Sequence, residues 1–93
     1  MTYIEKKTLE AEALVLDAGT DEARAAAQKI FEAFRHSGPG TDNTLEIIEA
    51  SIASTFSAFK NAVLTSNFEV IDPLTDRLLT LIKNRNRQLE AMK

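Results

Sequence analysis

The side chains of this chain that could do chemistry are few and scattered. His36 is the single histidine, and there is no cysteine. Zinc sites need several ligands at set spacings, and an activated nucleophile needs a base beside it. Ser51, Ser54 and Ser57 lie in a predicted helix, and no motif brings a base to them. We therefore expect no enzyme, no catalytic residue, no metal site and no cofactor, and we interpret His36 as a residue of a last helical turn, where it favours the helix dipole.

The loop Gly38-Pro39-Gly40-Thr41 is a second place where a ligand could bind, because phosphates bind at helix N-termini. It lacks the lysine and the spacing of a P-loop. The carboxylates of Asp42 and Glu46 would repel an anion there. The loop is therefore expected to be a turn between two helices.

The elements that carry these residues form one all-α domain over residues 1–93. Caps and apolar periods of three and four predict helices over 3–18, 21–36, 42–65 and 73–90. The last helix is expected to begin at Asp72-Pro73, since a cap followed by proline is typical of a first helical position. The preceding Phe68-Glu69-Val70 is either a short extended piece or a turn of helix, because Ser66 and Glu69 also fit a capping box. Short connections favour an antiparallel, up-down-up-down four-helix bundle. Its core is expected to hold Phe34, Ile48, Ile52, Phe56, Phe59, Leu78 and Leu81.

Overall charge and hydropathy limit the partners. The net charge of −3 argues against nonspecific nucleic-acid binding, which requires dense positive charge. No stretch approaches the 18 or so apolar residues of a membrane span. We expect a cytoplasmic protein with no membrane span and no nucleic-acid partner.

Two helices have apolar or neutral surface beyond what a simple core requires. In the first helix Leu9, Ala13 and Leu16 form a stripe separate from the line of Ile4, Ala11, Val15 and Ala18. This second stripe either lies in a groove or meets a partner. In the third helix, 50–59 carries no ionisable residue. Its neutral back face is either internal, flanked by neighbouring helices, or an interface with another subunit or partner.

Arg85 interrupts the apolar face of the fourth helix, between Leu81 and Leu89. Together with Lys83 and Arg87 it predicts a basic, exposed end. These three residues, with Leu9 and Leu16, are the candidate partner-binding residues. Charge reversal at Arg85 is accordingly expected to leave folding nearly unchanged.

The layout from about residue 25 to 87 resembles the immunity proteins that protect producers of class IIa bacteriocins. A helix ends in a polar loop (KIFEAFRHSGPGTDN), and a long helix with small residues follows (LEIIEASIASTFSAF). A link (SNFEVIDP) then leads to an amphipathic helix (LTDRLLTLIKNRN). The resemblance implies a cytoplasmic four-helix protein that binds a membrane sugar transporter engaged by the bacteriocin, with specificity set near residues 83–93. The chain is acidic and alanine-rich, where many of those proteins are rich in lysine.

We therefore expect a non-enzymatic helical binding protein, most specifically a bacteriocin immunity protein that acts by protein–protein contact. The alternative is a small phage or secretion-type assembly chaperone or adaptor that works as a homo-oligomer.

Overall fold

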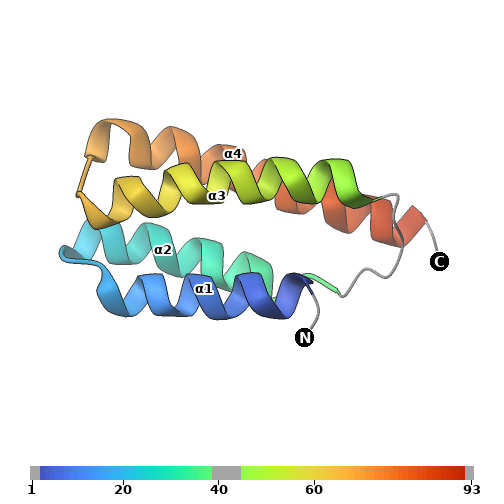
Figure 1. Ribbon diagram of the computed structural model, residues 1–93, viewed down its shortest axis with the longest axis horizontal. Coiled ribbons are helices and arrows are strands. Elements are labelled where there is room, and N and C mark those ends of the chain that lie inside the picture. Colours follow the sequence, from blue (N-terminus) through green and yellow to red (C-terminus); the bar gives the residue numbers. More distant parts are fainter. Residues whose placement is uncertain (1–2, 39–44, 92–93) are drawn as a thin grey trace.

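The computed structural model describes residues 3–38 and 45–91. Within these ranges it contains four helices and no strand: α1 (Tyr3–Asp17), α2 (Asp21–Arg35), α3 (Glu46–Leu64) and α4 (Phe68–Ala91). Figure 1 shows α1 beside α2 and α3 beside α4, with the 18–20 and 65–67 turns at the same end of the molecule. The prediction of an all-α fold built from four helices is confirmed.

Helix α2 begins where its sequence signals indicate. The Thr20 side chain accepts a hydrogen bond from the Ala23 amide at 3.2 Å, which satisfies one of the free N–H groups of the first turn. Asp21 and Glu22 follow in that turn, where the helix dipole favours negative charge. The predicted caps at Thr2 and Thr41 to Asn43 lie outside the described residues.

Helix α4 begins five residues earlier than predicted, at Phe68, and Pro73 lies inside it. Ser66 adopts a left-handed conformation (φ 53°) that ends the preceding helix, and the Asn67 carbonyl then accepts from the Ile71 amide at 3.2 Å. Proline inside a helix costs one backbone hydrogen bond. The additional turn buries Ile71, which is 2% exposed, and this burial offsets that loss.

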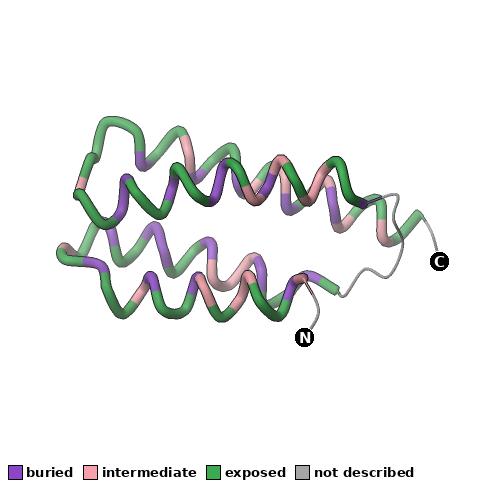
Figure 2. Tube along the Cα trace, viewed as in Figure 1, coloured by how far each residue is buried: buried purple, intermediate pink, exposed green. Residues whose placement is uncertain are grey.

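The core lies between the two helix pairs and is continuous along the bundle (Figure 2). Phe34 of α2 meets Phe56 of α3 edge to face, with ring centroids 5.6 Å apart. Five of the seven predicted core residues are buried: Phe34, Ile52, Phe56, Phe59 and Leu78. Ile48 and Leu81 are half-buried and pack against the core from its margin.

Helix α1 buries one stripe and exposes the other. Ile4, Ala11, Leu14 and Ala18 are buried, and Val15 is half-buried. Leu14 was not assigned to this stripe from the sequence. Leu9 is 51% exposed and Leu16 79% exposed, so the second stripe does not lie in an internal groove.

We expect Phe56→Ala to cost about 3–5 kcal/mol of the free energy of unfolding, because it empties a ring-sized volume between α2 and α3. A domain of this kind holds only about 5–15 kcal/mol in total, so the variant should melt far below the wild type. Ser57→Ala, at the exposed neighbouring position, is the control and should melt with the wild type. If Phe56→Ala melts at the same temperature as the wild type, Phe56 does not lie in the core.

Candidate functional site

Arg85 of α4 is the most unusual side chain of the described structure, because it is fully buried. Its position on the apolar face of α4 points it inward, between the end of α2 and the start of α3. Nε donates to a Glu49 carboxylate oxygen at 3.0 Å. The expectation that Arg85 lies at an exposed basic end is therefore wrong. The helix does not overhang the bundle here, because residues that follow α2 and Glu49 of α3 enclose the guanidinium.

A hydroxyl group and a backbone carbonyl just after α2 accept further hydrogen bonds from the Arg85 guanidinium. Nη1 of Arg85 donates to the Ser37 hydroxyl oxygen and to the Gly38 carbonyl, each at 2.8 Å. The Ser37 hydroxyl in turn donates to the Asn86 side-chain oxygen. Nη2 of Arg85 is buried and has no hydrogen-bond partner among the described residues. The arrangement fixes the end of α2 against α4.

Tyr3 connects α1 to the same network. Its hydroxyl donates to the Glu49 backbone carbonyl at 2.9 Å, and its ring lies 5.9 Å from the Arg85 guanidinium carbon. Burial raises the pKa of Tyr3 to about 12, with the charge of Glu49 acting in the same direction and that of Arg85 against it. We call Tyr3, Ser37, Glu49, Arg85 and Asn86 the arginine network. It brings side chains from α1, α3 and α4 onto the residues that follow α2.

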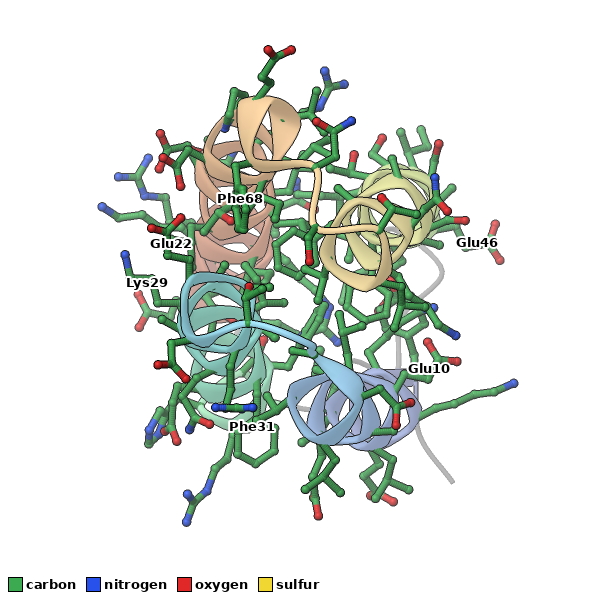
Figure 3. The ribbon with its side chains drawn as sticks, turned by 90° about the vertical axis from the view of Figure 1, so that its left-hand side faces the viewer. Glu10, Glu22, Lys29, Phe31, Glu46 and Phe68 are labelled. Carbon is green, nitrogen blue, oxygen red and sulfur yellow. The ribbon has the colours of Figure 1, made fainter. Side chains whose placement is uncertain are left out.

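The other predicted partner-binding residues are exposed but form two separate surfaces. Leu9 and Leu16 lie on the outer side of α1, and Lys83 and Arg87 lie on α4. Figure 3, which views the bundle end on, places α1 and α4 at opposite corners. Lys83 lines a shallow groove between α2 and α4 together with Lys29 and Leu79. The five candidates therefore do not form one site.

The outer face of α3 is a neutral surface that the described structure leaves uncovered. Ile47 is 83% exposed and Leu64 49% exposed. The small residues between them, Ala50, Ser54, Ser57, Ala58 and Asn61, are all exposed. The interpretation of this face as internal is therefore wrong, because α3 lies at a corner of the bundle and has neighbours on its inner side only (Figure 3).

Within residues 3–38 and 45–91, no group of three or more histidine, cysteine or acidic side chains is placed to hold a metal ion. No helix in that part of the chain is long and apolar enough to cross a membrane. His36, at the C-cap of α2, is exposed and lies 3.4 Å from the Glu32 carboxylate.

Comparison of the chain with protein-family models, with curated proteins and with solved structures finds no match.

We expect Arg85→Met to lower the free energy of unfolding by about 3–5 kcal/mol, because Glu49 and the Ser37 and Gly38 acceptors lose their common donor. Arg87→Met removes an exposed arginine two positions away and should stay within about 0.5 kcal/mol. In the double variant Arg85→Met/Glu49→Met the cost should be smaller than the sum of the single costs, since the unpaired carboxylate is gone. Urea unfolding of the wild type, the single variants Arg85→Met, Glu49→Met and Arg87→Met, and the double variant measures this. Equal stability of Arg85→Met and Arg87→Met would contradict the arginine network.

Tyr3 should titrate near pH 12 in the folded protein and near 10 in denaturant. It is the single tyrosine and there is no tryptophan, so the ultraviolet absorbance of tyrosinate reports this group alone. Because the unfolded chain releases the proton first, the Tyr3 contribution to stability is complete below about pH 10 and is lost as the pH rises towards 12. Tyr3→Phe should show a weaker decline in that interval. A folded-state midpoint near 10, with helical circular dichroism intact, would show that Tyr3 is solvated.

Proposed function

We propose that this chain is an antiparallel, up-down-up-down four-helix bundle that catalyses no reaction and acts by contact with other proteins. The observation that carries the proposal is the exposed outer face of α3, with Ile47 83% exposed at one end and Leu64 49% exposed at the other. A helix face that only meets water usually carries charge, whereas this one has small neutral residues along its length. Neutral surface flanked by large apolar side chains is typical of protein interfaces.

The most specific form of the proposal is a cytoplasmic bacteriocin immunity protein. It is supported by the resemblance of residues 25–87 to the proteins that protect producers of class IIa peptides. In this form the partner is the membrane transporter engaged by the bacteriocin. Lys83 and Arg87 remain exposed on α4, in the segment that the resemblance assigns to specificity. Arg85 is internal and would act only by holding that segment in place.

The second candidate is a phage or secretion-type assembly chaperone or adaptor working as a homo-oligomer. The exposure of Leu16 on α1 together with Ile47 on α3 favours it, because two apolar surfaces on different helices can link several copies. The genes beside this one separate the candidates: a bacteriocin precursor or its exporter supports immunity, and structural phage genes support the adaptor.

A survival assay tests the immunity form. Expressed in a sensitive strain, the wild type should raise survival against at least one class IIa peptide. Ser54→Arg places a long charged side chain in the middle of the α3 face and should lower that protection, because a charge buried without a partner opposes binding.

Thr80→Arg, at an exposed position of α4, is the matched control and should protect as well as the wild type. Both variants change surface residues, so both should remain folded, which circular dichroism checks. If the wild type protects against no class IIa peptide, immunity is wrong. If Ser54→Arg protects fully, the α3 face is not the contact surface.

A further inference from the structure

The exposed residues of α3 repeat with the spacing of a helix seam. Beginning at Ile47, the positions 50, 54, 57, 61 and 64 follow at alternating steps of three and four, and all are exposed. A step of 3.5 residues keeps side chains on one line along a helix that packs against a second helix. The middle of the line consists of Ala50, Ser54 and Ser57, whose small side chains allow a close approach of two backbones.

The charges of α3 are placed at opposite ends of this line. The charged residues between Glu46 and Leu64 are Glu46, Glu49 and Lys60. Glu49 pairs with Arg85 inside the arginine network. Glu46 and Lys60 are exposed, and neither forms an ion pair with another described residue. Figure 3 shows Glu46 pointing away from the bundle on the outer side of α3.

Glu46 and Lys60 also border the line on the same side. They are 14 positions apart, which is close to four helical turns. If a second α3 runs antiparallel across a two-fold axis near Ser54, each Glu46 lies beside the Lys60 of the other copy. The same symmetry brings each Ile47 close to the Asn61–Leu64 turn of the other helix. In a parallel arrangement the two-fold axis runs along the helices and places the two Glu46 side chains on opposite borders of the line, so neither would lie beside a Lys60.

We propose that the occupant of the α3 face is a second copy of this chain, packed antiparallel on α3 about a two-fold axis near Ser54. A two-fold interface uses the same patch on both subunits and must be complementary to itself. The face meets this condition, because a neutral seam is bordered by one acidic and one basic residue that exchange places under the rotation. This inference rests on the proposed function of the α3 face as a protein contact surface, and it names the partner.

Sedimentation velocity of the full chain over a concentration series tests the inference. The wild type should sediment as a dimer that dissociates on dilution. Glu46→Lys and Lys60→Glu should each raise the dissociation constant about tenfold, because each change turns two symmetric attractions into repulsions. The combined variant Glu46→Lys/Lys60→Glu restores opposite charges in exchanged positions, and its dissociation constant should return to within about threefold of the wild-type value.

Glu22→Lys is the control for Glu46→Lys, since both remove a carboxylate from the first turn of a helix. It should leave the dimer unchanged, and circular dichroism checks that every variant is folded. A monomeric wild type overturns the inference. So does a combined variant whose dimer dissociates as readily as those of the single variants. The survival assay with Ser54→Arg is scored independently. If the wild type is a monomer and Ser54→Arg still loses protection, the α3 face remains the proposed contact surface, but its partner is a different protein.

Discussion

A guanidinium enclosed by protein organises one end of this bundle. Removing Arg85 from water costs several kcal/mol, and only well-placed acceptors offset that cost. Glu49 supplies a carboxylate from α3, and Ser37 with Gly38 supplies two oxygens from the residues that follow α2. Since these acceptors come from different parts of the chain, the guanidinium is paired only when α2, α3 and α4 are in their final positions. The network therefore favours one arrangement of the helices over other compact arrangements with the same apolar contacts.

The opposite end of the molecule is held differently. The turns at 18–20 and 65–67 lie there, Ala18 and Ile71 are buried, and the ion pair of Arg24 with Asp21 is exposed and lies within one helix. Large apolar side chains around the second turn remain partly exposed, namely Leu64, Phe68 and Val70. The bundle thus has a polar, internally paired end and an apolar, more exposed end. Glu49 of α3 is paired inside the bundle with Arg85, and the outer face of α3 is nearly neutral because small uncharged residues occupy it.

Helix number, type and most core residues could be predicted from the sequence, because each depends on local periodicity and on caps. Thr20 is an example, since its cap needs only the three residues that follow it. Local signals left the start of α4 open, because Asp72-Pro73 and the capping-box spacing of Ser66 and Glu69 both mark a helix start. The local signal at Asp72-Pro73 competes with the burial of Ile71, and that burial depends on the other helices. For the candidate site, the sequence indicated an unusual Arg85 on an apolar face and a neutral α3. The sequence could not indicate whether Arg85 and the neutral face of α3 point into the bundle or away from it.

The sequence by itself determined an all-α chain with four apolar helix faces and an arginine on one of them, because helical spacing alone decides which residues share a face. Only the tertiary structure decided what each face meets. Arg85 is internal because Ser37 and Glu49, 48 and 36 positions away along the chain, are brought to its two donor nitrogens. The neutral face of α3 is external because α3 occupies a corner of the bundle, so its small residues face outward and Phe56 faces the core.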